Sequence, residues 1–267
     1  MTFLILSLFL FPLFLRADVL TVPTSAPENR LLKIHYRLPA SWNRESRIMV
    51  LFGGRNWPGN RTLSEYHFDQ LADQYNLILV SPSFVNDTYW EPEKWSGRAL
   101  FSAIGTLEKK FHLKRKKMLY YGFSAGGQCA NLFYAYAPER VFALGIHACG
   151  VYFNARGWKK PLVPILLTCG SEDPERFLIS KTFLCQYRES GGSLLWIPDH
   201  MGHQLNRFHL EIATCFFQNI LENSSPLWIG EDDTKLYYPI HEKEKIDPEF
   251  RNPLYDKKLL KFWEQTK

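Results

Sequence analysis

The sequence predicts an α/β protein with a mostly parallel central sheet that is flanked by helices on both faces. Short, continuous apolar runs recur along the chain, as expected of strands that are buried on both sides. Segments with apolar residues at helical spacing alternate with these runs, which is typical of strand–helix–strand units. Of the 267 residues, 46% are hydrophobic and 15% are aromatic, so the chain can bury a large core.

Most of the expected strands end at a glycine, a proline or a polar turn. The segment 31–38 alternates in hydrophobicity and is expected to be an antiparallel edge strand. The other expected strands are 47–54, 77–84, 117–122, 141–150, 161–170 and 193–199. The expected helices are 63–75, 96–112, 125–137, 176–190 and 207–222. The sequence has no internal repeat and no linker long enough to separate a second domain.

The segment 223–267 differs from the rest, with many charges, prolines and aromatic residues and no clear alternation of strands and helices. Its apolar side chains, among them Trp228, Phe250 and Trp263, could dock on the preceding part of the chain. We therefore expect one domain over residues 18–222 and a C-terminal extension packed on it. A disordered tail is the alternative.

The N-terminus carries the apolar run TFLILSLFLFPLFL, which ends at Arg16-Ala17-Asp18. This run is shorter than the roughly 20 residues that a membrane-spanning helix needs. Its length and the small Ala17 favour a signal peptide over residues 1–17 and export to the periplasm or the extracellular space. An uncleaved membrane anchor is the main alternative. A segment buried in the protein core, with no role in targeting, is the other alternative.

Charge and motifs argue against several classes of partner. The net charge of +5 is modest, and the densest basic run, Lys109–Lys117, falls at an expected helix end, where cations meet the negative end of the helix dipole. This favours a solvated helix end over a nucleic-acid-binding patch. The sequence has no zinc-ligand spacing, phosphate-binding loop or dinucleotide fingerprint, so we expect neither a metal nor a cofactor.

The five cysteines all lie in expected strands, strand ends or helices, which favours buried free thiols over a disulfide framework. Cys149 and Cys169 each end an expected strand and precede a glycine. If these strands are neighbours, the two thiols could lie close together, so a disulfide between them is a hypothesis.

The stretch YYGFSAGGQCANLF contains the pattern Gly-x-Ser-x-Gly, with Ser124 at its centre. Ser124 follows an expected strand and begins an expected helix, and a serine nucleophile is exposed at such a sharp turn. Gly122 and Gly126 would leave space where the chain crowds itself. The pattern therefore favours a nucleophile over a glycine-rich turn that happens to contain a serine.

A serine nucleophile needs a histidine base and a carboxylate that orients it. In this strand–turn–helix arrangement the expected chain order is serine, acid, histidine. Asp173, just after the expected strand 161–170, and His203, in a loop before the last helix, follow in that order. Glu172 and His200 are the competing acid and base, whereas His147 lies within a strand pattern and is expected to be a core histidine.

The backbone N–H of Ala125, directly after the nucleophile, is expected to be one donor of an oxyanion hole. The second donor is expected from Gly54 or Arg55 in the loop VLFGGRNWPGN, where glycines let the backbone approach a developing negative charge. The alternative is that this loop is a glycine-rich turn that takes no part in catalysis.

Aromatic residues follow most of the expected strands at their carboxyl ends, the edge where ligands bind in open α/β sheets. They suggest an aromatic substrate pocket, although any single one could be a packing residue. The candidates for substrate contact are Trp57, Trp90, Trp95 and Tyr152.

With these three motifs in place, residues 28–222 resemble the α/β-hydrolase superfamily. The stretches GFSAGGQCANLFYAYAPERVFAL, CGSEDPERF and HMGHQLN look most like the esterases grouped with polyhydroxybutyrate depolymerases and feruloyl esterases. The resemblance implies the α/β-hydrolase fold and hydrolysis of a small or polymer-derived ester through an acyl-enzyme on Ser124. A peptidase or acyltransferase with the same three residues, or a binding protein without turnover, are the alternatives.

Overall fold

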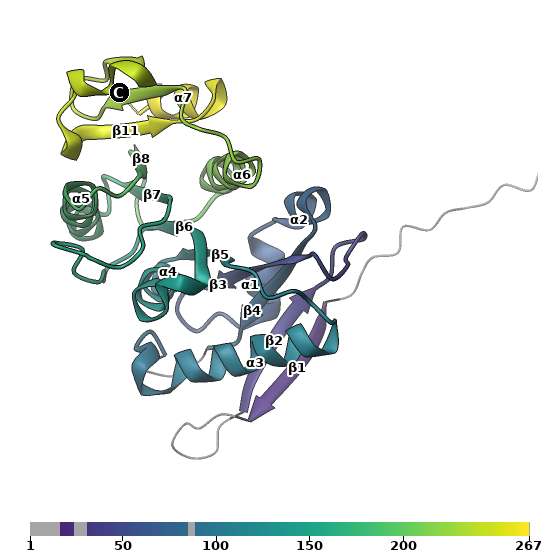
Figure 1. Cartoon of the computed structure of the whole chain (residues 1–267). Helices are drawn as coiled ribbons and strands as arrows, with labels where there is room; N and C mark the ends of the chain where they lie inside the picture. The colour runs from purple at the N-terminus through teal and green to yellow at the C-terminus, as the bar shows by residue number, and fades with distance from the viewer. Residues whose placement is uncertain (1–16, 24–30, 85–88, 267) are drawn as a thin grey trace, which may run out of the picture.

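The structure is a computed structural model and describes residues 17–23, 31–84 and 89–266. Its centre is an eight-stranded sheet in the order β1-β2-β4-β3-β5-β6-β7-β8 (Figure 1). Neighbouring strands from β4 to β8 are parallel, whereas β2 is antiparallel to both β1 and β4. The strands are β1 (Asp18–Pro23), β2 (Leu31–Arg37), β3 (Arg47–Phe52), β4 (Leu77–Pro82), β5 (Met118–Phe123), β6 (Val141–His147), β7 (Ile165–Gly170) and β8 (Leu194–Asp199). The prediction of a mostly parallel α/β sheet is confirmed.

Helices cover both faces of this sheet. Figure 1 shows α3, α4 and α5 on one face and α2 and α6 on the other. The helices are α1 (Gly59–Glu65), α2 (Asp69–Tyr75), α3 (Gly97–Lys110), α4 (Ala125–Tyr136), α5 (Pro174–Glu189) and α6 (Arg207–Leu221). A π-helical turn, Pro92–Ser96, leads into α3.

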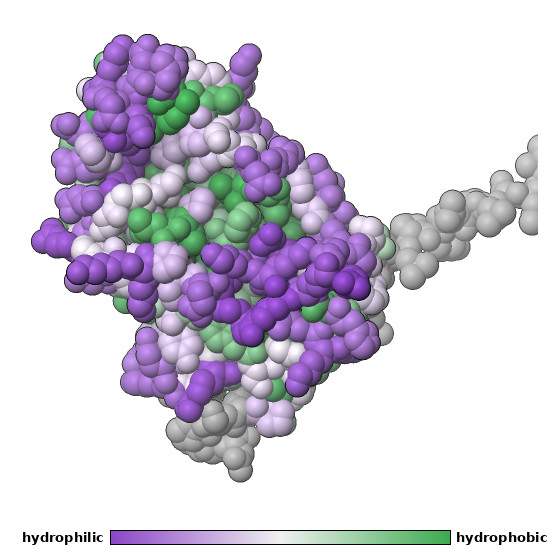
Figure 2. All heavy atoms as spheres, viewed as in Figure 1, coloured by the Kyte–Doolittle hydropathy of each residue, from purple (hydrophilic) through white to green (hydrophobic). Residues whose placement is uncertain are grey.

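The strands are buried to the extent that their apolar sequences predict. Every residue of β4, β5 and β7 is buried. Burying one large aliphatic or aromatic side chain stabilises a fold by roughly 1.5–3 kcal/mol, so these strands form the core of the protein. The surface seen in Figure 2 is largely hydrophilic, with hydrophobic residues gathered near its middle.

Two details of the predicted elements are wrong. The segment 31–38 is not an edge strand, because β1 pairs with its outer side. Strand β1 was not expected from the sequence, because most of its residues are exposed and it lacks a clear apolar pattern. The expected helix 63–75 is two helices, α1 and α2. The break contains His67, whose φ of 50° lies in the left-handed region that a right-handed helix cannot accommodate.

The C-terminal segment forms a small antiparallel sheet in the order β10-β9-β11, followed by a helix. Its elements are β9 (Trp228–Glu231), β10 (Tyr237–Pro239), β11 (Arg251–Leu254) and α7 (Lys257–Glu264). The segment lies beyond β8 in Figure 1, where β11 and α7 pack against β8 and α7 also packs against α6.

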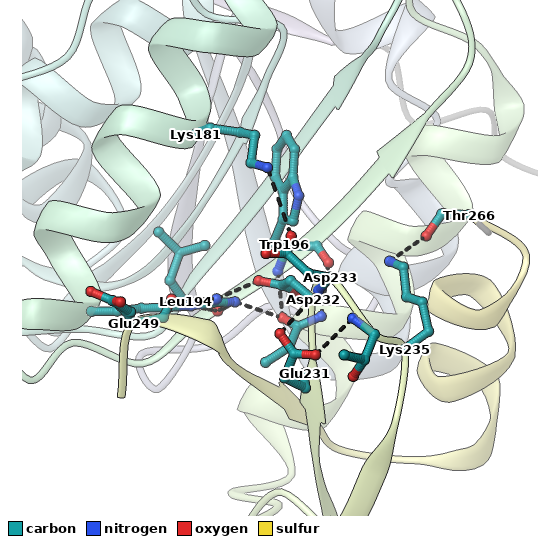
Figure 3. Close-up of polar contacts among 12 residues, drawn as sticks. Lys181, Leu194, Trp196, Glu231, Asp232, Asp233, Lys235, Glu249 and Thr266 are labelled. Atoms are coloured by element: carbon teal, nitrogen blue, oxygen red, sulfur yellow. Dashed lines mark hydrogen bonds and ion pairs between the residues drawn. The ribbon is translucent and has the colours of Figure 1, made fainter. Parts of the chain in front are cut away.

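One buried guanidinium joins this segment to the main sheet. Arg188 of α5 donates hydrogen bonds to the carboxylate of Asp232, the side chain of Asn252 and the carbonyl oxygens of Leu194 and Glu249. Figure 3 shows three of these partners, Leu194, Asp232 and Glu249, close together. Because Arg188 is 1% exposed, its charge requires these partners.

All five cysteines are free, so the hypothesised disulfide between Cys149 and Cys169 is absent. The Cys149 thiol donates to the carbonyl oxygen of Val151 at 2.9 Å, and burial raises its pKa to about 12. Among the described residues, no helix is long and apolar enough to cross a membrane. Almost all of the predicted signal peptide, residues 1–16, lies outside the described residues.

Candidate active site

Ser124 occupies a strained turn between β5 and α4. Its φ of 57° and ψ of −122° are outside the conformations that serine ordinarily adopts. Two glycines make the turn possible: a Cβ atom on Gly122 would lie 2.1 Å from the carbonyl oxygen of Gly126, and one on Gly126 would lie 1.9 Å from that of Phe52. The crowding expected at this strand-to-helix turn, which we call the elbow, is therefore present.

The three residues expected to act together form a continuous hydrogen-bonded chain. The Nε2 atom of His203 lies 2.9 Å from the Ser124 hydroxyl oxygen, and its Nδ1 atom lies 2.7 Å from Oδ2 of Asp173. An ionised carboxylate only accepts hydrogen bonds, so Nδ1 carries the proton and Nε2 is free to accept one from the serine. The side chains come from the carboxyl ends of β5, β7 and β8.

Asp173 is nearly buried and has both carboxylate oxygens engaged. Its side chain is 7% exposed, and its Oδ1 atom accepts a hydrogen bond at 2.9 Å from Nη1 of Arg176, one turn along α5. A buried charge is costly unless it is paired, so Arg176 compensates for the burial of this carboxylate. Arg176 was not among the residues expected from the sequence, although its spacing of three residues from Asp173 on a helix is a recognisable signal.

The competing acid and base lie outside this chain. Glu172 is exposed. His200 is also exposed, and its Nδ1 atom lies 3.3 Å from the hydroxyl of Ser171. His147 is a buried core histidine, as expected, with hydrogen bonds at both ring nitrogens.

The glycine loop after β3 packs directly against the elbow. A Cβ atom on Gly126 would lie 2.6 Å from the carbonyl oxygen of Gly53, and Gly54 is buried beside the rings of Trp57 and Phe123. Ala125 is the first residue of α4, so its N–H has no acceptor within the helix. The loop that carries Gly54 and Arg55 is thus close enough to the elbow to supply a second N–H.

The four aromatic candidates fall in three places. The ring of Trp57 packs with its centroid 6.1 Å from that of Phe123, beside Ser124, His203 and Asp173, which we call the triad. Trp90 and Trp95 belong to an aromatic cluster built on Tyr89 and Phe84. Tyr152 stacks on Phe183 of α5 at 4.4 Å, and its hydroxyl lies 2.9 Å from that of Ser180.

Two cavities lie outside the triad. An open groove of about 370 Å³ runs between the loop after β6 and α5, with Tyr152, Ile179 and Phe183 among its lining residues. A second cavity, of about 730 Å³, lies between α2 and α6 and contains no triad residue. Among the described residues, no group of three or more His, Cys, Asp or Glu side chains could hold a metal ion.

Comparisons with known proteins agree with this architecture. No family model and no curated protein matches the chain. Solved structures do match. A ferulic acid esterase aligns with a TM-score of 0.60 and 15% identity, over 78% of this chain and 99% of that one. The chain has the α/β-hydrolase fold.

Two further structures with this fold are similar over most of their length. The poly(3-hydroxybutyrate) depolymerase LpqC from Bordetella parapertussis has a TM-score of 0.58 and 14% identity, over 76% of this chain and 89% of that one. Esterase PE8 has a TM-score of 0.57 and 18% identity, over 74% of this chain and 100% of that one. The resemblance to these esterase groups, first seen in three short motifs, is therefore confirmed at the level of the α/β-hydrolase fold.

Proposed function

We propose that this protein is a serine hydrolase that cleaves carboxylic esters through an acyl-enzyme formed on Ser124. The observation that carries the proposal is the hydrogen-bonded chain from Ser124 through His203 to Asp173, with the serine held at positive φ. Esterases among the solved structures with the same fold support the choice of an ester as substrate.

In the first step, the Ser124 oxygen attacks the ester carbonyl while Nε2 of His203 takes the hydroxyl proton. The tetrahedral intermediate then collapses: the bond to the alcohol oxygen breaks, and His203 returns the proton to the departing alcohol. Asp173 keeps the proton of the imidazole on Nδ1 and stabilises the imidazolium that forms in each half-reaction. Water, deprotonated by His203, then attacks the acyl-enzyme and releases the acid and the free serine.

The negative charge on the tetrahedral oxygen requires hydrogen-bond donors. In this proposal, the N–H of Ala125 supplies one, and the N–H of Gly54 or Arg55 supplies the other. Their contribution is large, because loss of one such donor typically lowers kcat by about 100- to 1000-fold. Trp57, which packs beside both Gly54 and Phe123, is the aromatic residue best placed to contact the substrate.

Substitution of the nucleophile tests the proposal. Ser124→Ala should abolish turnover of a p-nitrophenyl ester and labelling by a fluorophosphonate probe, while circular dichroism stays that of the wild type. Ser102→Ala is the matched control, because Ser102 is exposed on α3 and should retain both activities. Undiminished ester turnover by Ser124→Ala would refute the assignment.

Substrate panels decide among reactions that share this triad. An ester panel that varies acyl length and aromaticity should include amide substrates, and parallel reactions should contain alcohol acceptors. Faster amide cleavage would favour a peptidase, and ester formation on the added alcohol would favour an acyltransferase. A folded protein that neither turns over any substrate nor reacts with the probe would be a binding protein.

The proposal includes export, which the apolar run before Ala17 supports. Expression with and without residues 1–17 tests it. We expect the full chain to reach the periplasm or medium with Asp18 as its new N-terminus, and the shortened chain to stay inside the cell. Full-length protein recovered from the membrane fraction would instead indicate an uncleaved anchor.

A further inference from the structure

The loop that carries His203, residues 200–206, is fastened at three backbone groups by buried side chains; we refer to it as the histidine loop. The N–H of Met201 donates to Oδ1 of Asp199 at 2.6 Å. The carbonyl oxygen of Gln204 lies 2.7 Å from Nε2 of His147. The N–H of Asn206 donates to Nδ1 of His209 at 3.3 Å. These attachments lie on both sides of His203.

The contact to Gln204 fixes the proton of His147. A carbonyl oxygen can only accept, so Nε2 of His147 must be the donor. In a neutral imidazole Nδ1 is then an acceptor, and it receives the hydroxyl hydrogen of Thr168 at 2.8 Å. Burial, together with neighbouring His209, lowers the pKa of His147 to about 3, so the neutral ring is the form present at pH 7. Thr168 therefore selects the tautomer that can hold the loop.

The second attachment follows the same logic. Nδ1 of His209 accepts from the N–H of Asn206, so its Nε2 carries the proton and donates to Oδ2 of Asp199 at 2.7 Å. Burial alone would raise the pKa of Asp199, but the hydrogen bonds from His209 and Met201 lower it below its ordinary value. The rings of His209 and His147 lie 3.9 Å apart, so the two attachments form one buried cluster.

We propose that Thr168, His147, Asp199 and His209 are positioning residues that hold the histidine loop so that His203 reaches Ser124 and Asp173 together. The Ser124 N–H donates to the backbone carbonyl oxygen of His147 at 2.9 Å, whereas the side chains of the four residues form their hydrogen bonds to the loop and to one another. All four are at least 93% buried, so water cannot replace the hydrogen bonds at little cost. This inference rests on the proposed function for its kinetic consequences, because a misplacement of about 1 Å can cost on the order of 100-fold in rate.

The variant Thr168→Val tests the proposal with the smallest change. It keeps the volume of the side chain but removes the hydroxyl, so His147 can adopt the tautomer that does not donate to Gln204. We expect kcat on a p-nitrophenyl ester to fall about 10- to 100-fold with KM changed by less than about two-fold. Thr168→Ser should restore most of kcat because it returns the donor.

The matched control is Thr214→Val on α6. The Thr214 hydroxyl donates to the carbonyl oxygen of Leu210 in its own helix at 2.7 Å, and this variant should keep the wild-type kcat. The double variant Thr168→Val with His147→Phe should be no slower than His147→Phe alone, because Thr168 acts through His147. A folded Thr168→Val protein with wild-type kcat, or rates that multiply in the double variant, would overturn the proposal.

Hydrogen exchange provides a readout that does not depend on ester turnover. In the Ser124→Ala background, Thr168→Val should accelerate exchange of peptides that contain residues 200–206, and Thr168→Ser should not. Unchanged exchange in Thr168→Val would also overturn the proposal. If wild-type protein fails to hydrolyse every ester while the loop still loosens in Thr168→Val, the proposed function falls and the role of the four residues in holding the loop stands.

Discussion

The rings of Phe123 and His203 stack with their centroids 5.0 Å apart and their planes at 29°. Phe123 lies between Gly122 and Ser124, at the first unspecified position of the Gly-x-Ser-x-Gly pattern, and its side chain contacts the proposed base. Its ring also stacks on that of His147, at 5.3 Å. The elbow therefore supports the imidazole of His203 through a side chain as well as presenting the serine.

Phe123→Leu should lower kcat by about 2- to 12-fold, because an aromatic pair contributes about 0.5–1.5 kcal/mol beyond the area that it buries. The apolar leucine keeps the position filled, so the elbow should remain intact and KM should change little. Steady-state kinetics on a p-nitrophenyl ester measures this. Phe101→Leu, which removes a ring stacked on Tyr136 of α4, is the control and should leave kcat unchanged. Equal kcat values for both variants would contradict the supporting role of Phe123.

Gly126→Ala should abolish ester hydrolysis and lower stability, because the new Cβ atom would lie 1.9 Å from one backbone oxygen and 2.6 Å from another. Neither atom belongs to a flexible side chain, so the elbow and the glycine loop would have to separate. Activity and the urea midpoint of unfolding measure the two effects.

Gly105→Ala is the matched control for this variant. Gly105 lies within α3, and a Cβ atom there meets nothing within 4 Å. The change should retain activity and raise stability by about 0.5–1 kcal/mol, because alanine favours the helix over glycine. Wild-type activity in Gly126→Ala would show that the elbow tolerates a side chain and would contradict the crowding in the structure.

The sequence predicts the sheet because its strands are buried on both faces and read as continuous apolar runs. The same property brings Ser124, Asp173 and His203 to one edge, since each was expected just beyond a strand. The elements that sequence analysis missed have weak local signals. Strand β1 has one buried residue among six, and the break at His67 depends on the conformation of a single residue.

Apart from the contact of Arg176 with Asp173, the supporting contacts of the site could not be read from spacing. Thr168, His147 and Gln204 are far apart in the chain, and only the register of β6 beside β7 brings the first two together. Apolar residues at 223–267 indicated that this segment could dock, but not that it would form a sheet. Its strands are only three or four residues long, too short for a clear alternation.

Asn252→Ala should weaken the attachment of the C-terminal segment. The Asn252 side chain accepts from the N–H of Trp196 at 2.7 Å and donates to its carbonyl oxygen at 2.9 Å, so it pairs with the outer edge of β8 as another strand would. Loss of this amide leaves the N–H and the carbonyl oxygen of Trp196 without their partner, and Nη2 of Arg188 loses one of its acceptors. We expect stability to fall by about 2–4 kcal/mol, since each buried unpaired group costs about 1–3 kcal/mol.

Urea unfolding measures this loss, and size-exclusion chromatography measures its consequence for assembly. An uncovered strand edge can pair with another molecule, so Asn252→Ala should also form larger species on storage. Asn60→Ala, at an exposed position of α1, is the control and should match the wild type in both measurements. Wild-type stability of Asn252→Ala would contradict the role assigned to this amide.

The buried His147 should make the protein sensitive to acid. Its pKa is lowered from 6.5 to about 3 by burial and by His209, so the unfolded chain binds a proton in this range that the folded protein does not. Stability from this residue is therefore fully present above pH 6.5 and is lost as the pH falls from about 6.5 towards 3. Between pH 7 and pH 5 the expected loss is about 2 kcal/mol.

His147→Gln isolates this contribution, because glutamine can still donate to Gln204 but does not titrate. The groups that face His147 are Thr168, which does not titrate, and His209 and Asp199, which are present in both proteins. The free energy of unfolding in urea should therefore fall by about 2 kcal/mol more in the wild type than in His147→Gln between pH 7 and pH 5. Parallel pH curves would mean that His147 takes up a proton in the folded protein over the same pH range as in the unfolded chain, and the hydrogen bond from Thr168 to its Nδ1 atom would then be wrong.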